Sequence, residues 1–315
     1  MQEHNLLSKY QQENKTFSPR FVYHIGAESG FFSEYNNMIL AMVYCFQHKM
    51  KFSIYSKDAN FKYDKGWDDY FIPFCDEYGG FLHSLFNRRT NDRFKNNTLK
   101  KLDIALTYLF RKSNLRILTT YDLWDYIRSQ KISAPYRFSS IGLIGDLRYI
   151  CQQFINMTWN YNEESKSTIR QLIDSIDLPA DYIGFHIRGG DKFTEAKIQE
   201  INVYIRKAES LSNLKEAFVL TDDYTIIESL RKNYPMWTFY TLCQPDERGY
   251  YHNQFKKESP TVKKSRYLKL FASMDLLSNS SLFVGTFSSN PGMYLGMRMN
   301  PEKTYSIDIP NWQIW

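Results

Sequence analysis

The second half of the sequence alternates short apolar runs with longer segments whose apolar residues recur every three or four positions. Parallel strands need a crossover connection that is usually a helix, so this alternation predicts βαβ units and a parallel sheet. The expected strands are Tyr182–His186, Ala217–Thr221, Trp237–Thr241, Leu282–Thr286 and Thr304–Ile307, and the expected helices span 199–212, 224–233, 262–279 and 290–299. The pattern restricts this half of the chain to an α/β fold.

The first half contains one similar unit. Phe21–Ile25 predicts a buried strand, and Gly26–Gly30 predicts a glycine-flanked loop after it. Apolar residues at helical spacing predict a helix from Glu34 onward, with Ser33 as its N-cap. Phe52–Tyr55 predicts the next strand. This order of elements would hold the glycine loop at one edge of a sheet.

The remaining segments suggest how the chain divides. Residues 80–178 predict mostly helix, and a length of 315 residues suits two domains. We expect an N-terminal α/β domain with a helical middle at 1–165 and a C-terminal Rossmann-like domain at 166–315.

Charge and hydropathy exclude several classes of protein. The sequence has 40 Lys and Arg against 34 Asp and Glu, a net charge of +6, which suits an anionic substrate but not a dedicated nucleic-acid binder. The longest apolar run, Met38–Phe46, is too short to span a bilayer, and the N-terminus lacks the apolar core of a signal peptide. The four cysteines form no CxxC pair, which predicts reduced thiols and a cytoplasmic protein.

Several catalytic motifs are missing from the sequence. There is no GxGxxG, no GxxxxGK[ST] and no GxSxG. The six histidines never occur at HxH or HxxxH spacing, which argues against a helical metal site. No D-x-D triplet occurs either, although this triplet commonly holds a divalent metal against a sugar nucleotide.

Polar residues gather where three of the expected strands end, which is the edge where parallel sheets bind ligands. Arg188 offers a bidentate fork to a diphosphate, and Gly189 lets the backbone approach closely. Ser288 and Ser289 begin a helix whose N–H groups and dipole favour an anion. Glu195 lies on the loop that leaves the first of these strands, where a carboxylate could take a proton from a hydroxyl.

The second strand end carries Asp222 and Asp223, whose carboxylates could hold sugar or ribose hydroxyls. Each candidate also has a structural interpretation. The two aspartates, like the two serines, could simply cap the helices that follow them. Arg188 could pair with Asp191, His186 could be a satisfied core histidine, and Glu195 could face solvent.

Five segments resemble the α-1,6-fucosyltransferase family, which includes animal core fucosyltransferase and rhizobial nodulation enzymes. HIRGGDKFTEA resembles the family's HxRR-x-D-K-x-G-T-E-A segment, VLTDD its strand-end aspartates, and LFVGTFSSNPG its TFSS segment. GFFSEYNNMILAMVYCF is similar to its glycine loop and following helix, and NFKYDKGWDDYFIPF to its N-W-R-Y…GGW…VF-x-P stretch. The likeness spans roughly residues 20–300 in order.

The resemblance implies a GT-B fold, with two α/β domains and the active site between them. It implies an inverting glycosyltransferase that moves L-fucose from GDP-fucose to a hydroxyl of a glycan, with no metal and no other cofactor. Residues 1–165 would then form the acceptor side, and residues 166–315 would bind the nucleotide sugar.

The resemblance also implies roles for individual residues. Glu195 would be the catalytic base, Arg188 would bind the pyrophosphate and stabilise departing GDP, and Lys192 would assist near the donor. The remaining donor-binding candidates are His186, Gly189, Asp191, Asp222, Asp223, Asp275, Ser288, Ser289 and Gly30. Among them Asp275 is the best match to the family's guanine-reading acid, and Gly189 replaces the family's second arginine.

Two other functions remain open from the sequence: transfer of another sugar from a GDP donor, and a non-catalytic module that binds a nucleotide sugar or a glycan. We expect GDP-fucose and a glycan acceptor as partners, and no nucleic acid. Attachment to the periphery of a membrane where glycans are assembled is an alternative to a fully cytoplasmic location. The acceptor and the oligomeric state are not defined by the sequence.

Overall fold

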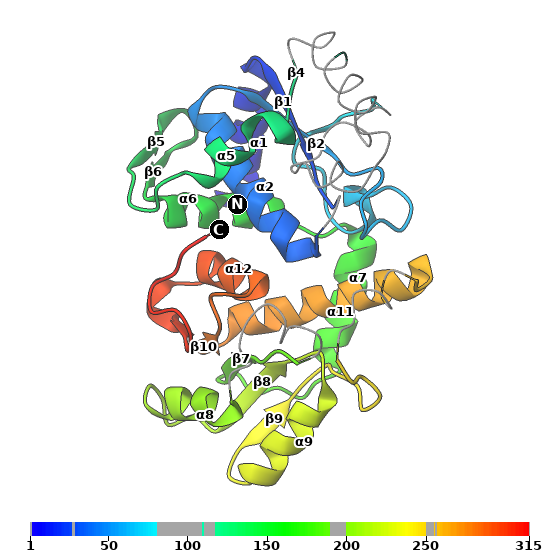
Figure 1. Cartoon of the computed structure of the whole chain (residues 1–315), viewed down its shortest axis with the longest axis vertical. Coiled ribbons are helices and arrows are strands. Elements are labelled where there is room, and N and C mark those ends of the chain that lie inside the picture. Colours follow the sequence, from blue (N-terminus) through cyan, green and yellow to red (C-terminus); the bar gives the residue numbers. More distant parts are fainter. Residues whose placement is uncertain are drawn as a thin grey trace. The chain divides into compact units, whose positions relative to one another are not determined.

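The computed structural model describes residues 2–26, 29–80, 109, 117–189, 200–249, 255 and 257–314 (Figure 1). The chain divides into two compact units: unit 1 comprises Met1–Asn160 with Trp315, and unit 2 comprises Tyr161–Ile314. The expected boundary at 165/166 lies five residues after this division.

Unit 1 is built around a four-stranded sheet of order β3-β2-β1-β4, in which every neighbouring pair is parallel. A separate antiparallel pair is formed by β5 and β6. The elements are α1 (Gln2–Thr16), β1 (Arg20–His24), α2 (Phe31–Gln47), β2 (Lys51–Tyr55), η1 (Trp67–Asp69), β3 (Asp76–Glu77), β4 (Ile117–Thr119), α5 (Thr120–Arg128), β5 (Tyr136–Phe138), η3 (Ser139–Ile141), β6 (Leu143–Gly145) and α6 (Leu147–Thr158).

Unit 2 contains a five-stranded sheet of order β11-β10-β7-β8-β9, and all of its pairs are parallel. The elements are α7 (Glu163–Asp174), β7 (Ile183–His186), α8 (Ile201–Glu209), β8 (Glu216–Leu220), α9 (Tyr224–Asn233), β9 (Thr238–Tyr240), α11 (Pro260–Asn279), β10 (Leu282–Gly285), α12 (Asn290–Arg298), η5 (Pro301–Lys303) and β11 (Thr304–Ser306). Each strand predicted in this half is present, and the helices between them are confirmed.

The core of unit 2 explains why this pattern was easy to recognise. The central strands β7 and β10 are buried at every position, so they appear in the sequence as short continuous apolar runs. Phe185 of β7 packs against Tyr204 of α8, with ring centroids 6.4 Å apart, and against Trp237, 5.9 Å away. Helix α11 crosses α7 and packs against the strands β7 and β8 (Figure 1).

Two features of unit 1 differ from what the sequence predicts. Helix α2 begins at Phe31, with Gly30 rather than Ser33 as its N-cap. The earlier start follows from burial, because Phe31 and Phe32 are only 2% and 3% exposed and both rings contact Trp159. The burial of these two rings stabilises a helix that begins at Phe31. This stabilisation outweighs the preference of Ser33 for the N-cap position of a helix that would begin later.

The second difference is the N-terminal helix α1, which the sequence pattern did not predict. It is held by two residues that face the rest of unit 1. Tyr10 is 1% exposed and stacks on Phe46 at 5.8 Å. The Asn14 amide donates to the carbonyl of Phe52 at 2.9 Å and accepts from its N–H at 2.7 Å, so it pairs with β2 like a backbone group.

The segment predicted to be mostly helical has more helix than strand in its described stretch 117–178. The helices α5, α6 and α7 lie there together with the short strands β4, β5 and β6, which the sequence did not predict. Each of these strands has three residues, which is too short to produce a recognisable alternation of apolar and polar positions.

Candidate functional site

The carboxyl ends of four strands meet at one edge of the unit 2 sheet, because β11, β10, β7 and β8 are neighbours and run parallel. The described residues that follow these strands include Arg188, Asp222, Ser288 and Asp308. The topology therefore brings together the three strand ends at which the sequence predicted polar residues. Asp308, which follows the fourth strand, lies at the same edge.

Gly189 is the point of closest approach between the ends of β7 and β8. Its N–H donates to Oδ1 of Asp222 at 2.7 Å. A Cβ atom at position 189 would lie 2.7 Å from Cβ of Asp223, a distance that real Cβ atoms do not reach. Glycine is required here because the neighbouring strand end occupies the space of a side chain.

The two aspartates have different tasks in the structure. Asp223 caps α9, since Oδ1 accepts from the N–H of Thr225 at 2.9 Å and from its hydroxyl at 2.8 Å. The capping interpretation is thus correct for Asp223. Asp222 instead fixes the backbone that follows Arg188, through the bond to Gly189. Its own carbonyl accepts from the N–H of Gly249 at 2.8 Å. Their contact with a sugar or ribose stays a prediction.

His186 ends β7 inside the protein and lies beside the start of α12. It is 5% exposed, and Nδ1 is 3.5 Å from Oγ of Ser289. Burial, and then the charge of Arg188, lower the pKa of His186 to about 3. The imidazole is therefore neutral at physiological pH, and the interpretation as a satisfied core histidine fits its surroundings.

Ser289 is the N-cap of α12, as the structural interpretation of this residue had it. Its hydroxyl accepts from the N–H of Gly292 at 3.2 Å and donates to the carbonyl of Thr286 at 2.9 Å. The helix begins very close to the strand, since a Cβ on Gly292 would lie 1.8 Å from that same carbonyl oxygen. The positive end of α12 is consequently fixed against the carboxyl end of β10.

Asp308 was missed by the sequence analysis. Its carboxylate accepts from the N–H of Phe287 at 2.9 Å and of Ser288 at 3.2 Å, and from the hydroxyl of Ser288. Burial raises the pKa of Asp308, but the hydrogen bonds from Ser288, Ser306 and the Phe287 N–H outweigh it, so the pKa lies below the ordinary value. The signal was available, because Asp308 directly follows the last expected strand.

Arg188 follows β7 at this edge and is half-buried. Its charge lowers the pKa of His186, and it also acts on Tyr204 of α8. Burial raises the pKa of Tyr204, and the negative charge of Asp308 raises it further, whereas Arg188 lowers it. Arg188 and Asp308 are therefore both close enough to Tyr204 to act on its hydroxyl electrostatically. The ends of β7 and β11 thus carry opposite charges at the same edge of the sheet.

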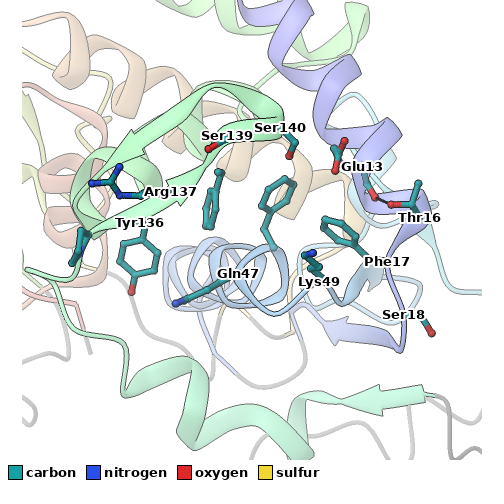
Figure 2. A pocket seen from close by; sticks show the side chains of 13 residues that line it. Glu13, Thr16, Phe17, Ser18, Gln47, Lys49, Tyr136, Arg137, Ser139 and Ser140 are labelled. Carbon is teal, nitrogen blue, oxygen red and sulfur yellow. Dashed lines mark hydrogen bonds between the residues drawn. The ribbon is translucent and has the colours of Figure 1, made fainter.

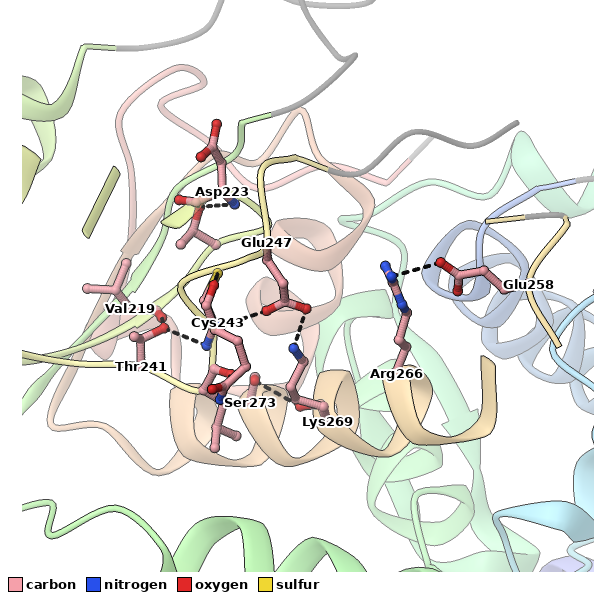
Figure 3. Close-up of polar contacts among 12 residues, drawn as sticks. Val219, Asp223, Thr241, Cys243, Glu247, Glu258, Arg266, Lys269 and Ser273 are labelled. Atoms are coloured by element: carbon pink, nitrogen blue, oxygen red, sulfur yellow. Dashed lines mark hydrogen bonds and ion pairs between the residues drawn. The ribbon is translucent and has the colours of Figure 1, made fainter. Parts of the chain in front are cut away.

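A loop after β9 covers the end of β8 and contains an ion pair that the sequence analysis did not identify. Glu247 pairs with Lys269 of α11 and accepts from the N–H of Gln244 at 2.8 Å (Figure 3). Burial raises the pKa of Glu247, but these bonds outweigh it and the pKa lies below its usual value. Burial, and then the charge of Glu247, raise the pKa of Cys243 to about 12, so this thiol is protonated. No motif marks either partner of the pair in the sequence.

Asp275 is not among the residues at this edge. Its carboxylate accepts from Arg298 at 2.7 Å and from the hydroxyl of Tyr161 at 2.9 Å. Arg298 ends α12, which rises about 1.5 Å per residue, so it lies roughly 13 Å along the helix from Ser289. The carboxylate is thus engaged by two partly buried partners, Arg298 at the other end of α12 and Tyr161, and guanine recognition by Asp275 stays a prediction.

The remaining predicted residues divide into two groups. Asp191, Lys192 and Glu195 lie outside the described residues. Gly30 lies in unit 1 as the N-cap of α2, with φ −64°, and no atom of the described residues lies within 4 Å of the position of a Cβ. Its contribution to donor binding stays a prediction.

The described residues contain no cluster of three or more His, Cys, Asp or Glu side chains that could hold a metal ion. In the same part of the chain, no helix combines the length and the apolar character needed to cross a bilayer.

Comparison with known proteins shows what the region around this site resembles. Residues 145–291 match a sequence model described as the N- and catalytic domains of alpha-(1,6)-fucosyltransferase. This span contains the ends of β7, β8 and β10. No curated protein sequence matches the chain.

Solved structures of one fucosyltransferase share the fold. NodZ from Bradyrhizobium has 13% identity and a TM-score of 0.54, with 89% of this chain and 92% of that chain covered. NodZ α-1,6-fucosyltransferase co-crystallized with GDP has 15% identity and a TM-score of 0.55, with 90% and 93% covered. The NodZ crystal soaked with GDP-fucose has 14% identity and a TM-score of 0.54, with 90% of this chain and 93% of that chain covered.

Residues 145–291 therefore resemble the α-(1,6)-fucosyltransferases, which are glycosyltransferases. The fold of the chain is the α/β fold of the GT-B class, as the resemblance implied.

Proposed function

We propose that this chain transfers L-fucose from GDP-fucose to a hydroxyl group of a glycan, with inversion at the anomeric carbon. The family match supports this reaction, as do the NodZ structures obtained with GDP and with GDP-fucose. The observation that carries the proposal is the convergence of Arg188, Gly189 and the start of α12 at the carboxyl edge of one parallel sheet. This is the edge where such sheets bind nucleotides.

In the proposed reaction, the oxygen of the acceptor hydroxyl attacks the anomeric carbon of fucose from the face opposite the nucleotide. The bond between that carbon and the β-phosphate oxygen breaks, and GDP leaves with the electron pair. The proton of the hydroxyl passes to Glu195 as general base. Arg188 stabilises the negative charge that develops on the diphosphate, with Lys192 as a second cation near the donor.

Arg188 carries most of the phosphate binding in this proposal. The hydroxyl of Ser289 is engaged in capping α12, and Ser288 already donates its N–H and hydroxyl to Asp308. Neither serine offers a donor group that phosphate could use without displacing a bond of the protein. Arginine binds phosphate through two parallel hydrogen bonds, which suits it to this task.

We propose that the reaction needs no metal, because the guanidinium of Arg188 and the positive end of α12 supply charge that a divalent cation would otherwise supply. The sequence has no D-x-D triplet to hold such a cation.

The proposal is tested by measuring GDP release from GDP-fucose and from GDP-mannose across a panel of glycans, with and without EDTA. Acceptor-dependent release from GDP-fucose, unchanged by EDTA, is expected. Release from GDP-mannose alone would assign a different donor. Binding of GDP-fucose with no release on any glycan would indicate a module without catalysis, and loss of release in EDTA would contradict the metal-free mechanism.

A further inference from the structure

Asp308 continues the pairing of β10 with β11 beyond the point where the backbone ladder ends. The ladder ends at the pair of Gly285 and Ser306. Two residues later, the carboxylate of Asp308 accepts from the N–H groups of Phe287 and Ser288, at 2.9 and 3.2 Å. These two N–H groups lie directly before the N-cap of α12. A carboxylate is therefore fixed beside the start of this helix.

The carboxylate of Asp308 remains ionised at neutral pH. On its own strand end it accepts from the hydroxyl of Ser306 and from the N–H of Ile309, the latter at 2.8 Å. Burial raises its pKa, but the hydrogen bonds outweigh burial and the pKa lies below the ordinary value. These donors are neutral groups, so they hold the carboxylate in place without cancelling its negative charge.

Arg188 places the opposite charge two strands away from Asp308. Strands β7 and β11 are both neighbours of β10. Neighbouring strands lie about 4.8 Å apart, so the ends of β7 and β11 are roughly 10 Å apart. Both charges act on Tyr204, whose pKa Asp308 raises and Arg188 lowers. A diphosphate that Arg188 binds beside the start of α12 would lie within about this distance of the Asp308 carboxylate.

The donor and the nucleotide product of the proposed reaction differ in charge. In GDP-fucose each phosphate group is esterified on both sides and carries one negative charge. In GDP the terminal phosphate loses a second proton with a pKa of about 6, so GDP carries one more negative charge at pH 8. A carboxylate roughly 10 Å away repels that extra charge enough to change a dissociation constant by about two- to tenfold.

We propose that Asp308 is a specificity-determining residue of the donor site, whose fixed negative charge weakens the binding of GDP relative to GDP-fucose. The inference rests on the proposed function. Arg188 attracts the charge that develops on the diphosphate as the bond to fucose breaks, and Asp308 limits how tightly the product is then held. Asp222 is a second carboxylate at this edge, but it holds the backbone directly after Arg188, so replacing it would move the arginine itself.

The test is calorimetric titration of GDP and of GDP-fucose at pH 8 into the wild type and into Asp308→Asn. The ratio of the dissociation constant of GDP to that of GDP-fucose should fall about two- to tenfold in the variant. Damage to the structure predicts a different result, because a loosened start of α12 weakens both nucleotides without favouring GDP.

Asp181→Asn is the matched control, since it removes the same charge at the opposite edge of the same sheet. Asp181 is exposed, lies two residues before β7, and accepts from the hydroxyl of Ser281 at 2.8 Å. Its ratio of dissociation constants should equal that of the wild type.

A pocket in unit 1 requires a second control, because it presents cations that a phosphate group could contact. It has a volume of about 720 Å³, and Lys49 and Arg137 are among the residues that line it (Figure 2). Arg137→Gln should leave both dissociation constants unchanged. Weaker binding in this variant would place the nucleotides in unit 1 and overturn the inference.

Asp308→Ser is a second uncharged variant, and it should change the ratio in the same direction; circular dichroism shows whether each variant is folded. The inference is overturned if the ratio in the folded variants equals that of Asp181→Asn. Binding of both nucleotides with an unchanged ratio would reject the inference alone. A wild type that binds neither GDP nor GDP-fucose would reject the proposed function, and the inference with it.

Discussion

At the residue scale, Gly189 is a position where this fold requires glycine. The family that the sequence resembles has a second arginine here, but in this chain Cβ of Asp223 occupies the space that a side chain at position 189 would need. Gly189→Ala should therefore destabilise the protein by about 1–3 kcal/mol, the usual cost of overpacking, because the ends of β7 and β8 must separate. Urea denaturation followed by circular dichroism measures this difference in the free energy of unfolding.

Gly30→Ala is the control for that experiment. No atom of the described residues lies within 4 Å of its Cβ position and its φ of −64° suits any residue, so its stability should stay near wild type. Equal stabilities of the two variants would show that the strand ends do not approach as closely as described.

The buried His186 makes a prediction about pH. Its pKa of about 3 in the folded protein lies below the value of about 6.5 expected in the unfolded chain. Between these values the unfolded state binds more protons, so this residue makes the protein more stable as pH rises through the window and less stable as pH falls. NMR of the imidazole should show no titration between pH 5 and pH 8. A midpoint near 6.5 would contradict the burial and the effect of Arg188.

The candidate site was predictable where residues follow a recognisable strand. Arg188, Asp222 and Ser288 were found because the carboxyl ends of parallel strands mark the ligand edge. Asp308 follows the same rule but was overlooked. The Glu247–Lys269 pair was beyond prediction, because its partners are 22 positions apart on a loop and a helix and belong to no motif.

At the scale of elements, helix α12 depends on its capping residue. Ser289→Ala removes the hydroxyl that accepts from the Gly292 N–H, and loss of an N-cap costs about 0.5–2 kcal/mol. We expect this loss in the free energy of unfolding, measured by chemical denaturation, and a weaker affinity for GDP because the start of the helix loosens.

Ser210→Ala is a suitable comparison, since Ser210 is exposed at the C-terminal end of α8 and its hydroxyl donates to the Lys207 carbonyl. This variant should change neither quantity. A Ser289→Ala protein as stable as the comparison would mean that the cap contributes nothing to α12.

The elements of unit 2 could be predicted because its central strands are buried on both faces and separated by full helices. Unit 1 resisted prediction for two physical reasons. Strands of three residues such as β5 carry too few positions for a pattern, and α1 is held by tertiary contacts of Tyr10 and Asn14 rather than by a marked amphipathic face. Local periodicity contains no information about such long-range contacts.

At the scale of the whole molecule, the proposed reaction needs a general base, and we assign this role to Glu195. Glu195→Gln should lower turnover of GDP-fucose by about a hundred- to ten-thousand-fold, because proton transfer contributes that much to the rate. The affinity for GDP should remain that of the wild type, since the amide keeps the shape of the side chain. Steady-state GDP release and calorimetry measure the two quantities.

The matched control is Glu200→Gln. Glu200 is exposed, lies five positions after Glu195 and directly before α8, and its side chain makes no capping hydrogen bond to that helix. It should retain full turnover. If Glu195→Gln were as active as this control, another group would be the base.

The most direct test of the account is calorimetric titration of GDP into the wild type and into Arg188→Ala, with Arg206→Ala, an exposed position on α8, as the control. Hydrogen bonds to a charged group contribute about 1.5–3 kcal/mol, so the dissociation constant of Arg188→Ala should rise at least about tenfold, while Arg206→Ala binds like the wild type. An unchanged dissociation constant in Arg188→Ala would remove the diphosphate from this edge of the sheet and contradict the assignment of the donor site.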